Sequence, residues 1–89
     1  MFSLPHISYV MPWDRVKILD KINDERSEQD RKYPDDDHLD DKTLNLILVE
    51  EVGEVSKAIL ENDNLEEELI QVAAVCVKWL EIIEKRKLK

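Results

Sequence analysis

The chain has 89 residues, of which 43% are hydrophobic, and a formal charge of -8 at pH 7. This length predicts one domain, residues 1–89, with a small core, and the hydrophobic fraction excludes wholesale disorder. The 21 acidic residues outnumber the 13 basic ones, which disfavours nucleic-acid binding because proteins of that class are usually basic. With one glycine and three prolines, few turns are expected, so we predict an all-α fold.

Membrane insertion and secretion are not expected from this sequence. No segment reaches the roughly 20 apolar residues that a membrane-spanning helix needs. Residues 1–10 are mildly apolar but lack the basic start and long apolar run of a secretory signal. Cys76 is the single cysteine, so an intrachain disulfide is excluded, and its apolar neighbours predict a small buried side chain. These features predict a cytoplasmic protein.

The first predicted helix runs from about Asp14 to Lys32, after an irregular arm over residues 1–12. Its expected inward positions share one helical face; they are Ile18, Ile22, Arg26, Gln29 and Tyr33. Only the first half of this stripe is apolar, which is typical of a helix that begins in a core and ends lining a site. A helix that runs out of the core into solvent fits the pattern equally well. Pro34 ends the helix because the residue before a proline avoids the helical region.

The second predicted helix spans about residues 42–62 and the third about residues 64–87. Asn64 and Glu67 match a capping box at the start of the third helix. The connection between the two helices is very short, so we expect them to fold back as an antiparallel hairpin. The third helix is apolar nearly all round at its centre, which leaves more apolar surface than a monomer can cover. We therefore expect a homodimer or homotetramer that completes a helical bundle.

Two glutamates of the second helix lie where core residues are expected. The apolar residues of this helix repeat at helical spacing; they are Leu44, Ile47, Leu48, Val52, Val55, Ala58 and Ile59. At about 100° per residue, Glu51 projects into the middle of this apolar face and Glu54 lies at its edge. Burying a carboxylate costs several kcal/mol unless a partner compensates, and a divalent cation is the simplest partner.

The third helix offers a matching pair of oxygen donors, Glu68 and Gln71, spaced i, i+3. In an antiparallel hairpin, a modest stagger places this pair opposite Glu51 and Glu54. Oxygen ligands suit Mg²⁺, with Mn²⁺ as a substitute, and Mg²⁺ usually also keeps waters and substrate phosphates. We therefore predict a metal site formed by Glu51, Glu54, Glu68 and Gln71. A structural network that buries the same carboxylates is the alternative that the pattern leaves open.

Gly53 lies between the two glutamates of the second helix. A glycine there costs about 1 kcal/mol relative to alanine. Close helix packing, with Ala73 and Ala74 opposite, is the first explanation, and close approach of a ligand is the second.

The segments LVEEVGEVSKAILE and EEELIQVAAVCVKWLE resemble the MazG-like branch of the all-α nucleoside triphosphate pyrophosphatases. That family carries EExxE on one helix and ExxD on the next; Glu50, Glu51 and Glu54 match the first element, and Glu68 begins the second. The segment ERSEQDRKYP resembles the stretch before the motif in small phage and bacterial members, so the likeness covers residues 25–81. The chain departs from the family at Gln71, where the family has an aspartate, and this amide brings no charge to a metal.

The resemblance implies Mg²⁺-dependent hydrolysis of a nucleoside or deoxynucleoside triphosphate to a monophosphate and pyrophosphate. Glu50 would then orient or deprotonate the attacking water, with a surface role as its alternative. Arg26, Lys32 and Lys57 are candidates for contacts to phosphates, although solvated or salt-bridged roles compete for each. Gln29 and Tyr33 complete the candidate substrate residues, Tyr33 by stacking on the base; Trp79 is better explained by packing.

A second hypothesis belongs to a different functional class. The chain would be a non-catalytic helical dimerisation or adaptor module with a degenerate metal site. In that case Glu51 and Glu54 would pair with lysine or arginine across an interface. A carboxylate di-iron bundle is disfavoured, because the Glu-x-x-His motifs that it needs are missing from the sequence.

Overall fold

The computed structural model describes residues 11–35 and 38–88, and this part of the chain contains three helices and no strand. The helices are α1 (Pro12–Lys32), α2 (Asp41–Glu61) and α3 (Leu65–Arg86). The all-α prediction is confirmed, and each helix end lies within two residues of the predicted one. Most of the predicted N-terminal arm lies outside the described residues. Pro12, which the sequence assigned to that arm, instead opens α1.

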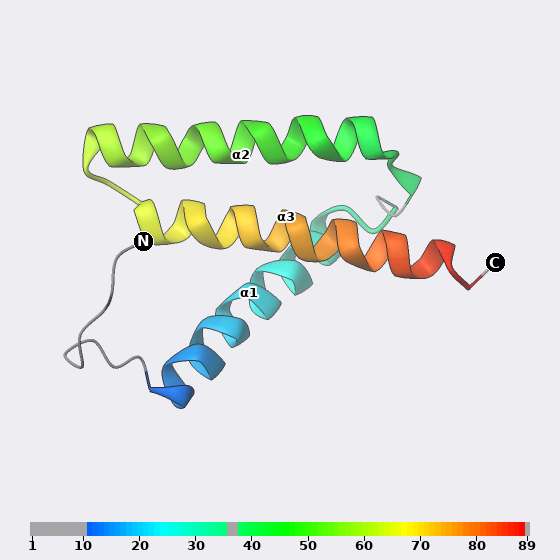
Figure 1. The fold of residues 1–89 in the computed structure, drawn as a ribbon, viewed down its shortest axis with the longest axis horizontal. Helices are drawn as coiled ribbons and strands as arrows, with labels where there is room; N and C mark the ends of the chain where they lie inside the picture. The colour runs from blue at the N-terminus through cyan, green and yellow to red at the C-terminus, as the bar shows by residue number, and fades with distance from the viewer. Residues whose placement is uncertain (1–10, 36–37, 89) are drawn as a thin grey trace, which may run out of the picture.

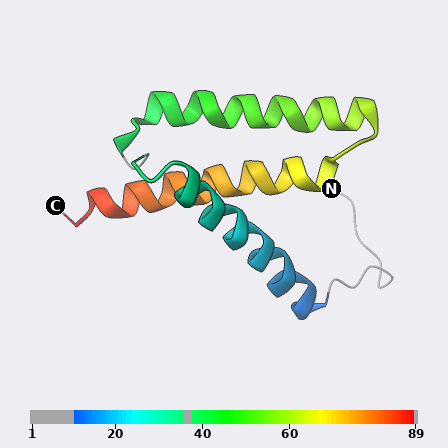
Figure 2. The ribbon, with the colours of Figure 1, turned by 180° about the vertical axis from the view of Figure 1, so that it is seen from behind.

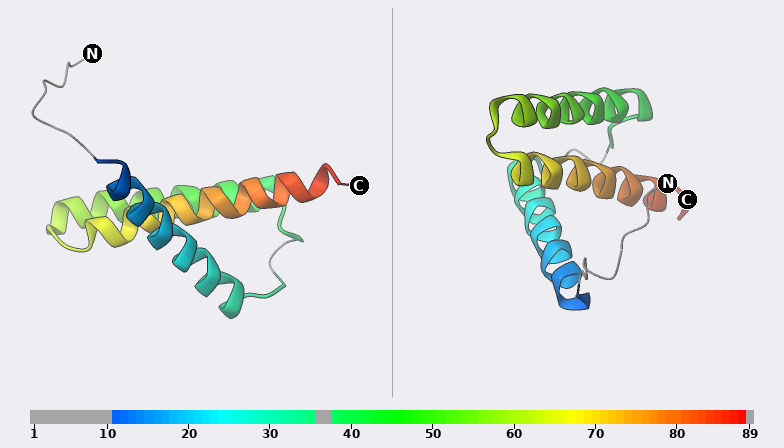
Figure 3. Two further views of the ribbon diagram at one scale, coloured as in Figure 1. Left: turned by 90° about the horizontal axis from the view of Figure 1, so that it is seen from below. Right: turned by 60° about the vertical axis from the view of Figure 1, so that its left-hand side comes forward.

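The third helix contacts both of the others. α2 lies alongside α3 and runs in the opposite direction, as Figures 1 and 2 show. α1 also packs against α3 and crosses it obliquely (Figure 3). The chain reverses between α2 and α3 at Asn62 and Asn64, whose φ angles are 54° and 60°. Asparagine tolerates this left-handed conformation better than most residues, so two asparagines suit so short a connection.

The small apolar core is formed by residues of α2 and α3. Its buried apolar residues are Leu44 and Ala58 on α2, and Ala74, Val75 and Ile82 on α3. Leu44 is only 1% exposed. The inward assignments of Val52 and Ile59 are wrong, since these side chains are 48% and 61% exposed. The contact face of α2 is narrower than its apolar pattern suggested because α3 is its main neighbour.

The N-termini of α2 and α3 are capped in different ways. Asp40 caps α2, because its carboxylate accepts a hydrogen bond from the Thr43 backbone N–H at 2.8 Å. The capping box predicted at Asn64 and Glu67 is wrong, since the Asn64 side chain makes no capping hydrogen bond. Its left-handed backbone turns the chain directly into α3, and its carbonyl accepts from the Glu68 N–H at 3.0 Å.

The apolar first half of α1 is largely exposed. Ile18 is 50% exposed, and Trp13, Val16 and Leu19 are also open to solvent. Ile22, the other apolar residue of the predicted inward stripe, is half-buried. The prediction that this helix begins in a core therefore fails at Ile18 and is met only in part at Ile22. Its only buried residue is Arg26, which belongs to the second, polar half of the helix.

Further apolar residues are exposed on α2 and α3, including Val49, Leu60, Leu69 and Leu80.

A Cβ placed on Gly53 would meet no atom within 4 Å. Close packing of Gly53 against α3 of the same chain is therefore wrong. Among the described residues, no helix has the combination of length and apolar character that crossing a membrane requires.

Candidate functional site

A pocket of about 430 Å³ lies between the second half of α1 and the α2–α3 pair. All three helices and the segment after α1 contribute to its wall. The lining residues are Glu25, Gln29, Lys32, Tyr33, Leu39, Leu44, Ile47, Glu51, Gln71, Val75 and Lys78. The wall therefore combines carboxylates, amides and lysines with a group of aliphatic side chains, as expected for a site that holds a ligand with charged and apolar parts.

The second half of α1 forms one wall of this pocket. Glu25, Gln29 and Lys32 are spaced i, i+4 and i+7, so they share one helical face, and Tyr33 follows directly. Gln29, Lys32 and Tyr33 were expected from the sequence to contact a substrate, and the structure brings all three into the pocket. Glu25 also lines the pocket but was not predicted to do so, although its position one turn before Gln29 places it on the same helical face.

Glu51 provides the acidic part of the opposite wall. It is half-buried and follows Leu44 and Ile47 along the inward face of α2. Burial raises the pKa of the Glu51 carboxyl, and the negative charge of Glu68 raises it further; Glu54, Glu50 and Glu25 add smaller effects. Carboxylates from all three helices therefore lie close enough to Glu51 to disfavour its charged form.

The other predicted metal ligands are distributed around Glu51. Gln71 lines the same pocket from α3. Glu68 is half-buried and Glu54 is exposed, and both influence the Glu51 pKa without lining the pocket. Within residues 11–35 and 38–88, no three His, Cys, Asp or Glu side chains are grouped closely enough to hold a metal ion by themselves.

The donor set around Glu51 still fits Mg²⁺. This ion is commonly held by one or two protein carboxylates, with waters and substrate phosphates completing the octahedron. It therefore does not require a cluster of three acidic side chains. The negative charge that raises the Glu51 pKa is one that such a cation would offset.

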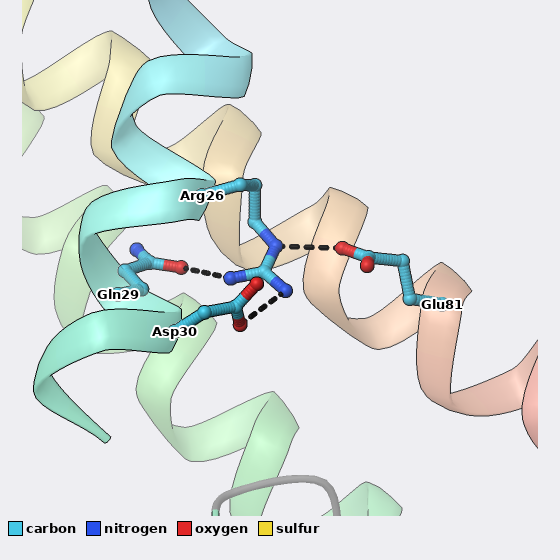
Figure 4. Close-up of polar contacts among 4 residues, drawn as sticks. All are labelled: Arg26, Gln29, Asp30 and Glu81. Atoms are coloured by element: carbon cyan, nitrogen blue, oxygen red, sulfur yellow. Dashed lines mark hydrogen bonds and ion pairs between the residues drawn. The ribbon is translucent and has the colours of Figure 1, made fainter. Parts of the chain in front are cut away.

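Arg26 does not line the pocket, although the sequence suggested a phosphate contact. Its guanidinium is buried and donates to Glu81 at 2.6 Å, to Asp30 at 2.9 Å and to Gln29 at 3.2 Å, as Figure 4 shows. Burial lowers the pKa of Arg26, but the hydrogen bonds to Glu81 and Asp30 outweigh that effect, and the net shift is upward. Arg26 is thus a fixed cation that links α1 to α3.

Two further candidates from the sequence, Glu50 and Lys57, are exposed on α2 and do not line the pocket. Trp79 is also outside it, and its indole N–H donates to Asp41 at 2.9 Å. The pocket instead includes Lys78, which no motif or helical face in the sequence had indicated. Only the packing angle between α1 and α3 reveals this lysine as a wall residue.

The apolar part of the pocket was also missed. It consists of Leu39, Leu44, Ile47 and Val75. Leu44 and Ile47 were predicted as ordinary core residues, because their helical spacing is the same whether they face a core or the floor of a pocket.

No family model, curated protein or solved structure matches this chain. The resemblance to the MazG-like pyrophosphatases thus rests on the motif residues themselves. Of these, Glu51 lines the pocket, and the negative charges of Glu54 and Glu68 raise the pKa of Glu51.

Proposed function

We propose that this chain is a Mg²⁺-dependent nucleoside triphosphate pyrophosphohydrolase, which converts a ribo- or deoxyribonucleoside triphosphate to a monophosphate and pyrophosphate. The observation that carries the proposal is the composition of one pocket. Glu51 and Gln71, two of the residues predicted to hold a metal, line it together with Gln29, Lys32 and Tyr33, which were predicted to contact a substrate. These two sets were chosen from separate parts of the sequence.

The proposed roles follow from the chemistry of each wall. Glu51 and Gln71 would hold Mg²⁺, and the charges of Glu54 and Glu68 would add to its attraction. When bound, the ion would supply charge neutralisation at the phosphates and a more acidic water. Lys32 adds a positive charge for phosphate oxygens. Tyr33, Leu39, Leu44 and Ile47 offer an aromatic ring and an aliphatic surface for the base.

Glu50 remains the proposed proton acceptor for the attacking water. It neighbours Glu51, is exposed, and its charge contributes to the raised Glu51 pKa. An exposed carboxylate beside a metal–phosphate site is available to water. Arg26 and Lys57 are not assigned to phosphate binding, since neither lines the pocket.

Pyrophosphate release tests this function. Purified protein with Mg²⁺ is offered a panel of ribo- and deoxyribonucleoside triphosphates, and pyrophosphate and monophosphate are quantified together. The proposal predicts equal amounts of both products from at least one nucleotide, at least about 100-fold loss in Glu51→Gln, and unchanged activity in Glu61→Gln. Glu61 is a matched exposed glutamate on the same helix. Folded protein without activity on any member of the panel would remove the proposal.

The second candidate function is a non-catalytic dimerisation or adaptor module, and the exposed apolar side chains favour it. On α3, Leu65, Leu69 and Leu80 are exposed and share one face. Val49 and Val52 are exposed on one face of α2, beside the open position at Gly53. An apolar groove of about 490 Å³ also lies between α1 and α3. Large exposed apolar patches usually mark interaction sites.

A homodimer or homotetramer that covers these faces is compatible with either function. Calorimetry separates the two functions. The enzyme proposal predicts that Mg²⁺ strengthens the binding of a non-hydrolysable nucleoside triphosphate, and that Glu51→Gln weakens it. The adaptor proposal predicts no nucleotide binding at any Mg²⁺ concentration.

A further inference from the structure

We propose that Arg26 is a positioning residue that orients the Gln29 side chain, so that the Gln29 amide nitrogen donates a hydrogen bond to the nucleotide in the pocket. This inference rests on the proposed function, because it concerns how the same pocket holds its substrate. It assigns a role to the one buried charged residue that the described part of the chain contains.

The contact between Arg26 and Gln29 determines which atom of the Gln29 amide, the oxygen or the nitrogen, faces Arg26. A guanidinium has only hydrogen-bond donors, so the Gln29 atom that faces Arg26 must be the carbonyl oxygen. Arg26 Nη1 donates to this oxygen at 3.2 Å. The amide nitrogen therefore lies on the side away from Arg26, as Figure 4 shows. A free glutamine could present either atom.

The guanidinium itself has little freedom to move. Arg26 is 7% exposed, and it also donates to Glu81 on α3 and to Asp30 on α1. Three acceptors use three different nitrogens of one rigid planar group. The orientation of Gln29 is thus tied to the packing of α1 on α3.

The position of Gln29 shows where its donor would act. Gln29 lines the pocket and Arg26 does not. On α1, Gln29 lies one turn after the acidic Glu25 and just under one turn before Lys32, both of which also line the pocket. A neutral donor between an acidic end and a basic end suits an uncharged oxygen of a nucleotide, on the sugar or the base, better than it suits a metal.

Steady-state kinetics on the nucleotide hydrolysed fastest by the wild type tests this inference. Gln29→Met removes the donor at similar size and is expected to raise KM about fivefold, the cost of one neutral hydrogen bond. The value of kcat should stay within about twofold, because the contact is equally strong before and during the reaction. Arg26→Lys keeps a cation but cannot reach three acceptors, and it should raise KM to a similar extent.

The double variant shows whether the two residues act together. If Arg26 acts through Gln29, then Arg26→Lys changes KM by less than about twofold in a Gln29→Met background. Asp30→Asn is the matched control: it weakens another bond of the same guanidinium, so it should lower the melting temperature without changing KM.

Two results would overturn the inference while leaving the enzyme intact. One is an equal rise in KM from Arg26→Lys in both backgrounds. The other is a rise in KM from Asp30→Asn as large as that from Arg26→Lys, which would mean that Arg26 only tethers the helices. A wild-type protein with no activity on any nucleotide instead removes the proposed function, and this inference with it.

Discussion

The indole N–H of Trp79 donates to Oδ1 of Asp41 at 2.9 Å, which joins the second half of α3 to the first residue of α2. The same carboxylate oxygen pairs with Arg86 at 2.9 Å. The hydrogen bond from Trp79 lowers the pKa of Asp41, and Arg86 lowers it further. One carboxylate thus fastens the end of α2 that lies farthest from the α2–α3 connection.

Replacing Asp41 is expected to lower stability in a pH-dependent way. An acid whose pKa is lowered by folding stabilises the fold above its ordinary pKa, and this contribution is lost as the pH falls through the folded-state pKa. Asp41→Ala should therefore be less stable than wild type near pH 7, and the gap should narrow in strong acid as the charge-dependent part of the contribution is lost. Asp41→Asn should fall between the two, because its amide oxygen still accepts from Trp79.

Urea unfolding followed by circular dichroism, repeated from about pH 7 to about pH 2, measures this effect. Asp20→Ala, at an exposed position on α1, is the control and should follow the wild type. A stability gap for Asp41→Ala that stays constant down to the lowest pH would contradict the assignment.

Leu44 is expected to be the most sensitive apolar position of α2. It is fully buried between helices and also contributes to the pocket floor. Leu44→Ala should lower the free energy of unfolding by about 2–5 kcal/mol, since it removes apolar contacts and leaves a cavity. Leu19→Ala, at an exposed position on α1, should change it by less than about 0.5 kcal/mol. Similar values for the two variants in chemical denaturation would mean that the core is misplaced.

Glu51→Gln is expected to stabilise the metal-free protein. Burial and neighbouring carboxylates raise the pKa of Glu51, so its charged form opposes folding, and stability falls as the pH rises from the ordinary glutamate pKa through the raised one. The variant should be more stable at pH 7 by about 1 kcal/mol or less, because water screens a half-buried site. Below about pH 4 the difference should vanish.

Thermal unfolding with and without Mg²⁺ checks this prediction. Glu61→Gln, at an exposed position on the same helix, provides the control and should not show the gain. If Glu51→Gln were instead less stable than wild type at pH 7, the carboxylate would belong to a stabilising ion pair, as the adaptor hypothesis requires.

Oligomerisation through the exposed apolar faces can be tested with two charge insertions. Leu80→Glu on α3 and Val52→Glu on α2 place a carboxylate on faces that the chain leaves uncovered. We expect the wild type to sediment as a dimer or tetramer and both variants to shift toward monomer, because a buried unpaired charge is costly. Val16→Glu, at an exposed position on α1, should keep the wild-type state. A wild type that stays monomeric at micromolar concentration would contradict this expectation.

The helices could be predicted because their signals are local. Pro34 predicted the end of α1, which the structure places at Lys32, and helical spacing predicted the extents of α2 and α3. The exposure of Val52 and Ile59 could not be predicted, because an apolar stripe does not say how many neighbours will cover it. Asn64 misled for a different reason: a polar residue before a helix suits either a side-chain cap or a left-handed turn, and here the turn is used.

The candidate site was predicted in part for a similar reason. Gln29 and Tyr33 were found because polar residues continue the inward stripe of α1, whereas Lys32 was proposed as a phosphate contact from the family resemblance. The same stripe contained Arg26, and nothing in its spacing distinguishes a residue facing a ligand from one facing Glu81. That difference depends on the angle at which α1 crosses α3 (Figure 3), which sequence periodicity does not encode.

The most direct test of the account is a nuclear magnetic resonance titration of side-chain amides with a non-hydrolysable nucleoside triphosphate. Gln29 and Gln71 are the only glutamines of the chain, and both line the pocket. If the pocket binds a metal–nucleotide complex, both amide signals shift when Mg²⁺ and the nucleotide are added together, Glu51→Ala abolishes the shifts, and the signal of the exposed Asn45 on α2 stays unchanged. Saturating Mg²⁺ and nucleotide that leave both glutamine signals in place would contradict it.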